Sequence, residues 1–357
     1  MNETLVLGGG LAGAGAASLL AAAGRPVRLL EREPGPHHKV CGEFLSVEAQ
    51  RDLERIGLDI ARLGPVPIGG VRLVSGEREA ESALPFTALG LSRKLLDEAL
   101  LDHAATLGAQ IERGVRITQV NDGRVATSHG DSLSDTILLA TGKHDVRGAS
   151  HKAPRGGDGY VGFKMHYRAG ARTRRELAGM IELVVFKGGY AGMQLVATDV
   201  MNLCLIVRRA RLADAGDWER LLLALMDEPG MRRRLEDAEA LFDKPLAISG
   251  LPYGHVCKDA DGLYRLGDQA AMTASLTGDG MAIALRSAVA ASEAVLSGTP
   301  PELFQRHFSK EVTGQISRAM LLQRAAEAPP LLALALPILK LWPRLLGHAA
   351  AMTRLPA

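Results

Sequence analysis

The stretch TLVLGGGLAGAGAASLLAAAGRPVRLLERE, residues 4–33, decides which fold the rest of the chain can adopt. An apolar tetrapeptide is followed by Gly8, Gly10 and Gly13, then by an Ala/Leu-rich segment and a second apolar run that ends at Glu31. This order predicts a strand, a tight turn, a helix and a second strand. That combination is the βαβ unit of dinucleotide-binding proteins.

Each glycine of the turn has its own role in this unit. Gly8 permits the tight turn, Gly10 lets the backbone approach a pyrophosphate, and Gly13 permits close packing of the helix, whose first amides face the phosphates. Glu31 ends the second strand, where a carboxylate accepts hydrogen bonds from an adenosine ribose. The alternative is a glycine-rich turn that binds nothing.

A second glycine-rich region lies at GLYRLGDQAAMTASLTGDGMAIAL, residues 262–285. A short strand there ends at Gly267 and Asp268, and a helix is expected from about Met281. An Asp after a strand can bind a ribityl or ribose hydroxyl, and a helix N-terminus below a ring can stabilise charge on a reduced flavin. The alternative for Asp268 is a solvated turn carboxylate.

Composition excludes several classes of protein. The 357 residues suit a two-domain enzyme, and a formal net charge of +2 gives no electrostatic argument for nucleic acid. Three scattered cysteines, Cys41, Cys204 and Cys257, match neither a disulfide framework nor a zinc site. The chain begins directly with a strand, and no apolar run reaches the roughly 20 residues of a membrane span. We therefore expect a cytoplasmic protein, and no partner protein is evident.

Together these motifs resemble those of FAD-dependent oxidoreductases with the glutathione-reductase type of fold. More narrowly, they are similar to the group of geranylgeranyl reductases, FixC-like proteins, flavin halogenases and single-component aromatic hydroxylases. The likeness rests on ordered segments: GGGLAGAGAA with LLERE, KVCGEFLSVEA at 39–49, LSRKLLDEAL at 91–100, LLATGKHDVRG at 138–148, and LGDQAAMTASLTGDGMAIAL at 266–285. It implies FAD as cofactor, with NAD(P)H as a transient visitor because a second GxGxxG is missing.

The resemblance also implies which residues bind FAD. Arg93 should reach the phosphates or the ribityl chain, and Asp268 should bind the ribityl chain. Gly278 to Met281 should lie under the pyrimidine edge of the isoalloxazine ring. The expected FAD-binding residues are Gly8, Gly10, Gly13, Glu31, Arg32, Arg93, Thr141, Gly142, Gly267, Asp268, Gly278, Gly280 and Met281. No metal site is expected, because no third ligand is suitably spaced from the pair His37 and His38.

The middle of the chain is rich in β-type runs, GYVGFKMHYRAG, MIELVVFKGGYAGMQLVA and VMNLCLIVRRA, which predict an inserted sheet. In GFKMHYR the alternation predicts two faces, one with Phe163, Met165 and Tyr167 and the other with Lys164, His166 and Arg168. One face should cover flavin and substrate, and the other should meet helices or solvent. The expected architecture is α/β: a discontinuous Rossmann-like FAD-binding domain (1–67, 93–150, 255–300), an inserted antiparallel β-sheet substrate domain (68–92, 151–254) and a C-terminal helical segment (301–357).

Candidate catalytic side chains are few, because a flavin performs most of the chemistry itself. His166 and Tyr190 stand on expected substrate strands and could hydrogen-bond a phenol or carbonyl, or else fill packed or rim positions. Cys41 resembles the cysteine that lies near the isoalloxazine in geranylgeranyl reductase-like proteins. Its alternative role is that of a small residue packed beneath the ring.

Three activities remain open. The favoured one is a monooxygenase that hydroxylates a lipophilic or aromatic metabolite with NAD(P)H and O2. The alternative is a reductase or dehydrogenase acting on carbon–carbon bonds, as in the geranylgeranyl reductase group. An electron-transfer flavoprotein is less favoured, because an enclosed sheet domain has little use in an electron carrier. Trp218 and Trp342 stand far apart in the sequence, which argues against halogenation.

The most apolar stretch is APPLLALALPILKLWPRLLGHAAAMTRLPA, residues 328–357. It follows an expected helix at about 301–325, and Pro337 and Pro343 predict a break into short helices. One expectation is that its large apolar residues pack across the two domains, namely Leu331, Leu334, Ile338, Leu341 and Leu345. The other is that this face lines the substrate entrance or rests at a membrane interface, with Trp342 at headgroup level.

Overall fold

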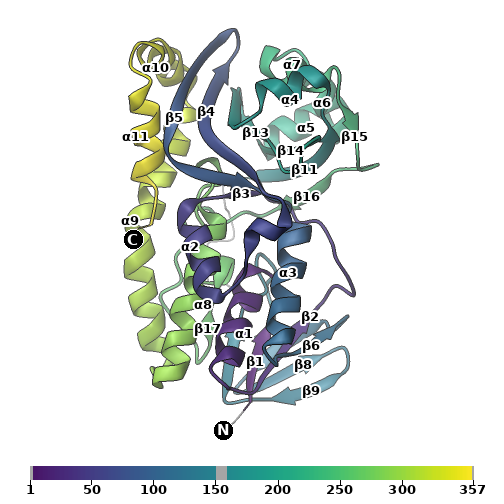
Figure 1. Ribbon diagram of the computed structural model, residues 1–357, viewed down its shortest axis with the longest axis vertical. Coiled ribbons are helices and arrows are strands. Elements are labelled where there is room, and N and C mark those ends of the chain that lie inside the picture. Colours follow the sequence, from purple (N-terminus) through teal and green to yellow (C-terminus); the bar gives the residue numbers. More distant parts are fainter. Residues whose placement is uncertain (1–2, 150–158, 356–357) are drawn as a thin grey trace.

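The computed structural model describes residues 3–149 and 159–355, which form a parallel-sheet unit, a larger sheet above it and a flank of C-terminal helices (Figure 1). The smaller sheet has five parallel strands in the order β17–β10–β1–β2–β6. Their bounds are β1 Thr4–Leu7, β2 Val27–Glu31, β6 Gln110–Arg113, β10 Thr136–Leu139 and β17 Tyr264–Arg265. The central strands are buried almost throughout, as expected for a parallel sheet covered on both faces.

Alternate side chains of this sheet enter two different cores. Val6, Leu29 and Leu138 pack with helices that include α1 (Leu11–Ala22), α3 (Arg93–Thr106) and α8 (Gly280–Ser297). Leu5 and Leu139 face the other way. There they pack with a small sheet formed by β7 (Ile117–Asn121), β8 (Arg124–Thr127) and β9 (Gly130–Leu133).

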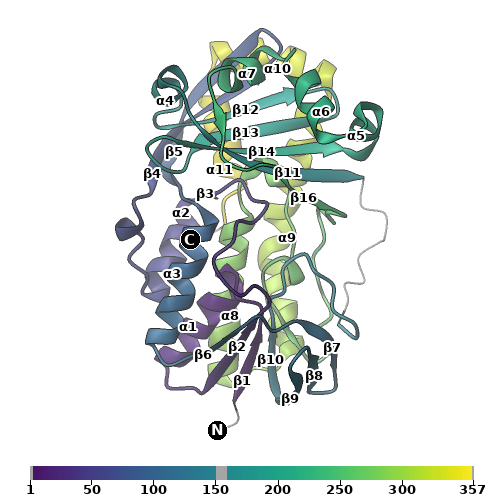
Figure 2. The ribbon, with the colours of Figure 1, turned by 90° about the vertical axis from the view of Figure 1, so that its right-hand side faces the viewer.

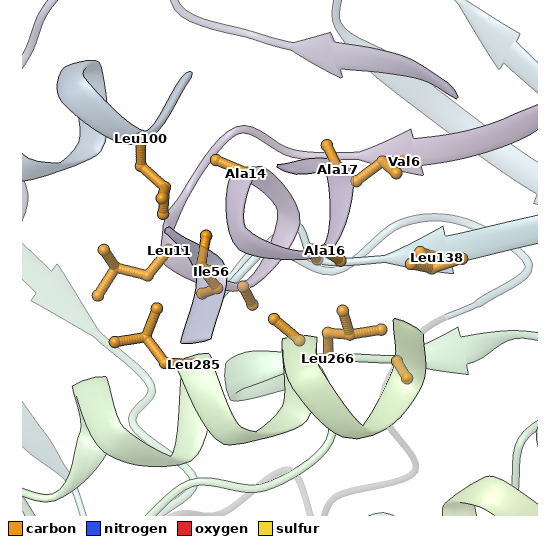
Figure 3. Packing of buried hydrophobic residues seen from close by; sticks show 14 of the residues in the cluster. Val6, Leu11, Ala14, Ala16, Ala17, Ile56, Leu100, Leu138, Leu266 and Leu285 are labelled. Carbon is orange, nitrogen blue, oxygen red and sulfur yellow. The ribbon is translucent and has the colours of Figure 1, made fainter. Parts of the chain in front are cut away.

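The small residues of α1 set how closely it approaches its neighbours (Figure 3). A Cβ on Gly13 would lie 1.9 Å from the carbonyl oxygen of Gly8, and one on Gly15 would lie 3.3 Å from Cβ of Ala288 in α8. Gly8 itself has φ +107°. The turn and the helix packing that the sequence indicates therefore both require glycine.

The larger sheet runs β15–β11–β14–β13–β12–β4–β5–β3, with β16 also paired to β11. Its bounds are β3 Phe44–Leu45, β4 Val66–Ser75, β5 Arg78–Gly90, β11 Tyr160–Arg168, β12 Met180–Phe186, β13 Gly189–Leu195, β14 Val200–Arg208, β15 Glu239–Ala240 and β16 Leu246–Ser249. All pairs are antiparallel except β4–β12. The α/β fold class expected from the sequence is confirmed, with this one parallel pair as an addition.

The two faces of β11 are as the alternation predicts. Phe163, Met165 and Tyr167 join an apolar core beneath short helices. These are α4 (Ala171–Glu176), α5 (Arg209–Ala215), α6 (Trp218–Leu225) and α7 (Pro229–Leu235). Lys164 and His166 are also buried, and both contact Glu43. The larger sheet lies between these short helices and the parallel-sheet unit (Figure 2).

The C-terminal helices run along the flank of the molecule. They are α9 (Pro301–Ala326), α10 (Pro329–Leu341) and α11 (Arg344–Met352). The described residues also form α2 (Val47–Ile56) and three short 3₁₀ helices, at Ile60–Leu63, Gly267–Gln269 and Ser275–Thr277. The expectation that Pro337 breaks the chain is wrong, because Pro337 lies within α10. The break falls at Trp342 and Pro343, where the chain bends by 117° between α10 and α11.

Within residues 3–149 and 159–355, one helix, α8, is long and apolar enough to cross a membrane by length and composition. The bent pair α10–α11 passes the same test only if it is counted as one span. The α8 window is 61% buried inside the protein. It packs against α1 and α2. We therefore interpret α8 as a core helix.

Candidate functional site

A cavity of about 700 Å³ lies between the two units. Its lower wall is formed where the parallel strands end, after β1, β2, β10 and β17, which is where α/β sheets bind ligands. Its upper wall comes from β14 and β16 of the larger sheet and from the loop at residues 37–43. The volume falls within the range of cofactor and substrate pockets.

Glu31 marks one end of the cavity. The carboxylate is buried and accepts hydrogen bonds from the backbone N–H of Gly9 (2.6 Å) and of Glu33 (2.9 Å). Arg32 lies beside it in the cavity wall. The two backbone bonds fix the carboxylate at the tip of β2, where a ribose of a dinucleotide would meet it.

The next section is suited to a diphosphate. Gly10 precedes helix α1, which begins at Leu11, and its position provides no side-chain cap for the first amides of the helix. A Cβ on Gly10 would lie 3.4 Å from Nζ of Lys39 and 3.8 Å from Nη2 of Arg93. Both cations pair with Asp97, at 2.9 Å from Lys39 Nζ and 2.7 Å from Arg93 Nε. Two cations beside one carboxylate leave a net positive charge at the N-terminus of α1. This charge suits the diphosphate of a dinucleotide.

Asp97 stays ionised in this arrangement. Burial alone would raise the pKa of its carboxyl, but the charges of Arg93 and Lys39 outweigh burial and hold that pKa below its usual value. The carboxylate thus orients both cations beside α1.

The far end of the cavity is formed by the second glycine-rich region. Gly278 has φ +73°, and a Cβ there would lie 2.7 Å from Cδ1 of Phe44. Asp268, Gly280 and Met281 line the same end. Contact between Phe44 and Gly278 therefore places the 41–44 loop next to the turn that the resemblance assigns to the flavin ring.

Asp279 lies within this turn and is fully buried. It pairs with Arg354 of the C-terminal tail at 2.6 Å. Burial raises the pKa of Asp279 to about 6, although Arg354 acts in the opposite direction. The C-terminus is thereby tied to the start of α8.

The side-chain amide of Gln269 makes three contacts with the loop after β10. Gln269 Nε2 donates to Thr141 Oγ1 (3.0 Å) and to the carbonyl oxygens of Gly142 (2.7 Å) and His144 (3.0 Å). Thr141 and Gly142 line the cavity as a result.

A buried charge cluster stands at the upper wall, where Glu43 meets two residues of β11. Lys164 Nζ donates to Glu43 Oε1, and His166 Nε2 contacts Glu43 Oε2 at 2.7 Å. The backbone N–H of Arg93 donates to Oε1 at 2.7 Å. Glu43 lines the cavity, and Lys164 and His166 stand directly behind it.

The backbone of Glu43 indicates that its side chain matters. It has φ +57°, a conformation that favours glycine and costs about 1 kcal/mol or more for other residues. The preceding peptide is held by the sheet, since Gln194 and Asn202 donate to the carbonyl oxygen of Gly42 at 2.7 and 2.9 Å. These contacts keep the carboxylate aimed at Lys164 and His166.

The cluster holds its charges in a definite state. Burial would raise the pKa of Glu43, but the hydrogen bond from His166 and the charge of Lys164 lower it, so the carboxylate is ionised. Burial, followed by the charge of Lys164, lowers the pKa of His38 to about 4, so His38 is neutral at physiological pH. The His38 ring meets His166 edge-on, with centroids 4.9 Å apart.

The same geometry tests the expectation that no metal is bound. Ligand atoms of His38, Glu43 and His166 lie within 4.8 Å of one another, so the structure supplies the neighbours that spacing in the sequence did not show. One oxygen of Glu43 already accepts from the Lys164 ammonium, which repels a cation. We interpret the group as a hydrogen-bonded charge cluster.

Most residues expected from the sequence meet at this cavity. Its lining includes Gly8, Gly10, Glu31, Arg32, Cys41, Arg93, Thr141, Gly142, Gly267, Asp268, Gly278, Gly280 and Met281. Gly13 instead packs beneath the turn, and Tyr190 lies in an apolar cluster with Leu332 and Leu336 of α10. Burial raises the pKa of Tyr190 well above its usual value. The catalytic roles of His166, Tyr190 and Cys41 stay predictions.

Sequence reasoning missed Glu43, Lys164 and Asp279. The period-2 pattern does place Lys164 on the face of His166, and that signal could have singled it out. Neither the burial of this face nor the positive φ of Glu43 can be seen in the sequence.

Comparisons with known proteins agree with the interpretation of this cavity as a dinucleotide-binding site. Residues 1–137 match the family model described as an FAD binding domain. The chain is 26% identical over 342 residues to a menaquinone reductase of Mycolicibacterium smegmatis, covering 86% of this chain and 81% of that protein. It is 32% identical over 129 residues to the flavin-dependent halogenase armH3 of Armillaria mellea, which covers 34% of this chain and only 25% of the halogenase.

Among solved structures, a flavoprotein/dehydrogenase from Cytophaga hutchinsonii aligns with a TM-score of 0.79 at 20% identity, covering 93% of this chain and 88% of that one. This likeness shows the fold. The family model and the donor groups of the cavity together identify FAD as the cofactor. The findings support an FAD-dependent oxidoreductase.

Proposed function

We propose that this protein is an FAD-dependent oxidoreductase that reduces a carbon–carbon double bond of a lipophilic small molecule. The observation that carries the proposal is the buried Lys164–Glu43–His166 cluster at the ring end of the cavity. Such a reduction adds a hydride to one carbon and a proton to the other. FAD, when bound, supplies the hydride, with NAD(P)H as its transient source.

The residues of this chain have to hold the proton. The Lys164 ammonium donates to the ionised Glu43 carboxylate, which lines the cavity, so Glu43 would take a proton from Lys164 and pass it to a substrate. His38, neutral at physiological pH, stands beside this cluster and lines the cavity. A proton source close to the ring and shielded from water is what a reductase requires.

The part of the cavity wall formed by β14, β16 and the residues near Leu251 and Met272 is largely apolar. Ile206, Ile248, Leu251 and Met272 line it. Tyr253 adds an aromatic ring there. A lipophilic substrate would bury its apolar surface against these side chains, at roughly 25 cal/mol for each Å² removed from water. The relative that matches along 86% of the chain is named a menaquinone reductase, which favours a lipophilic substrate here as well.

A monooxygenase that hydroxylates a lipophilic or aromatic metabolite with NAD(P)H and O2 is the second candidate. One observation favours it: Nδ1 of His38 is buried without a hydrogen-bond partner among the described residues. Because this imidazole is neutral, it can accept a hydrogen bond from the hydroxyl of a phenol.

A single experiment separates the two reactions. The FAD-loaded protein is reduced without oxygen, a polyprenyl quinone is added, and the products are weighed by mass spectrometry after exposure to air. A product that is heavier by two hydrogen atoms after exposure to air supports reduction of a carbon–carbon double bond. If only the quinone ring had been reduced, the quinol would reoxidise in air and lose the two hydrogen atoms. Incorporation of an oxygen atom from labelled O2, with no anaerobic reoxidation of the flavin, would establish the monooxygenase instead.

A further inference from the structure

The outer face of α10 carries a row of large apolar side chains. Leu331, Leu334, Ile338 and Leu341 follow one another at spacings of three and four residues, so they share one helix face. Trp342 and Leu345 continue the row across the bend into α11. These six side chains, the α10 stripe, are between 45% and 75% exposed. The expectation that they close the core is therefore wrong.

The opposite face of α10 does the packing. Leu332 and Leu336 are buried against the larger sheet, and Arg78 of β5 donates to the carbonyl oxygen of Ala333 at 3.0 Å. Helix α11 lies against β5 so closely that a Cβ on Gly347 would approach the Ala83 carbonyl oxygen to 2.8 Å. Because both helices are fixed from within, the α10 stripe is held outward.

The charged residues of the segment that carries the stripe are cations, although Lys340 borders a pocket with Glu77 and Glu79 and Arg354 pairs with Asp279. Residues 328–357 contain Lys340, Arg344 and Arg354 and neither Asp nor Glu. Lys340 and Arg344 flank Trp342 at the bend. An apolar stripe bordered by cations, with Trp between them, is the pattern of a helix that lies in the interface of an anionic bilayer.

The geometry also suits a surface rather than a span. Helix α10 has 13 residues. It is therefore about 20 Å long, shorter than the roughly 30 Å hydrocarbon core of a bilayer. It lies at the end of the molecule opposite to the N-terminus, where a flat surface can reach it (Figure 1).

The stripe is connected to the cavity by a single apolar cluster. Leu332 and Leu336, on the inner face of α10, share that cluster with Tyr190. They share it also with Leu251 and Met272, which line the cavity. This cluster joins the inner face of α10 to the apolar wall of the site.

We propose that the α10 stripe docks on an anionic lipid bilayer and that the lipophilic substrate passes from the bilayer to the cavity beside α10. The six side chains enter the interface, and Lys340 and Arg344 contact lipid phosphates. The substrate route rests on the proposed function, whereas the docking does not.

The test is flotation of the FAD-loaded full chain with vesicles of phosphatidylcholine alone or mixed with phosphatidylglycerol. Wild-type protein should float with the mixed vesicles and less with the neutral ones, and added salt should weaken its binding. Leu334→Glu with Leu341→Glu should lower partitioning at least tenfold for each leucine, because each side chain leaves the interface. Both leucines are exposed, so the variant should fold as wild type does.

A matched control carries the same charge change elsewhere. Leu133→Glu with Leu223→Glu alters two leucines, on β9 and α6, that are 79% and 73% exposed. This control should float as wild type does. An equal loss of vesicle binding in both double variants would overturn the docking. So would a wild-type protein that binds neither kind of vesicle.

Two further readouts separate the alternatives. The chain has two tryptophans, so Trp218→Phe leaves Trp342 as a reporter whose emission should shift to the blue on anionic vesicles. Sedimentation velocity tests whether a second copy covers the stripe. If the wild-type protein is a dimer that does not bind vesicles, and the double variant Leu334→Glu, Leu341→Glu is a monomer, then a second copy of the chain covers the stripe and the proposal is replaced. Flotation without reduction of a polyprenyl quinone would reject the proposed function and leave the docking intact.

Discussion

Replacing Glu43 by glutamine tests the buried charge cluster directly. Glu43→Gln keeps the shape and an oxygen acceptor for the Arg93 amide, which donates to Oε1 at 2.7 Å. It removes the negative charge that the buried Lys164 ammonium contacts. The variant therefore leaves a cation in the interior without its contact carboxylate.

The expected cost is large. Removing one partner of a buried ion pair typically destabilises a protein by about 3–5 kcal/mol, because the remaining charge stays desolvated. Lys164→Met should cost less than this, since the Glu43 carboxylate keeps its contact with His166. The double variant Glu43→Gln, Lys164→Met should be more stable than the sum of the single changes implies, by about 1–3 kcal/mol.

The pH dependence gives a second readout. The pKa of Glu43 is lowered in the folded protein, so its stabilisation is present above the unfolded pKa and is lost as pH falls through the folded value. This acid-side loss should be smaller in Glu43→Gln. Urea unfolding followed by circular dichroism and flavin fluorescence at several pH values measures both effects.

The control is an exposed ion pair whose cation, Arg168, lies on the same strand, β11, as Lys164. Glu239 contacts Arg168 at 2.6 Å, and both side chains are more than half exposed, so Glu239→Gln should change stability by less than about 1 kcal/mol. Our interpretation of the cluster would be refuted if Glu43→Gln also changed stability by less than about 1 kcal/mol. It would also be refuted if the stability changes of Glu43→Gln and Lys164→Met added up to that of the double variant.

Two other predictions concern the FAD-binding unit. Gly13→Ala should abolish FAD retention, because its Cβ would lie 1.9 Å from the Gly8 carbonyl oxygen. The control Gly35→Ala, whose Cβ would have open space around it, should retain FAD. Flavin absorbance after gel filtration measures how much FAD each variant retains. Burial raises the pKa of Asp279 to about 6, so protonation of this carboxyl favours the folded state. Its contribution to the free energy of unfolding is about 3 kcal/mol at low pH and is lost as pH rises from about 4 to 6. Asp279→Asn should flatten unfolding temperature across that range, and an unchanged profile would contradict the assignment.

Much of the FAD-binding unit follows from the sequence because its determinants are local. Gly8, Gly10 and Gly13 act within one turn, and their spacing is fixed by strand and helix geometry. The faces of β11 also follow from the sequence, since side chains alternate along any strand. In such segments each residue's environment is set by neighbours a few positions away.

Other features depend on contacts between distant segments, which only the tertiary structure decides. Glu43 and Lys164 are 121 residues apart, and the fold alone brings the carboxylate to the ammonium. The leucines of α10 illustrate the same point, because the sequence left open whether they pack or face outward. Leu332 and Leu336 fill the space against the larger sheet, so Leu334 and Leu341, on the other side of the helix, face outward.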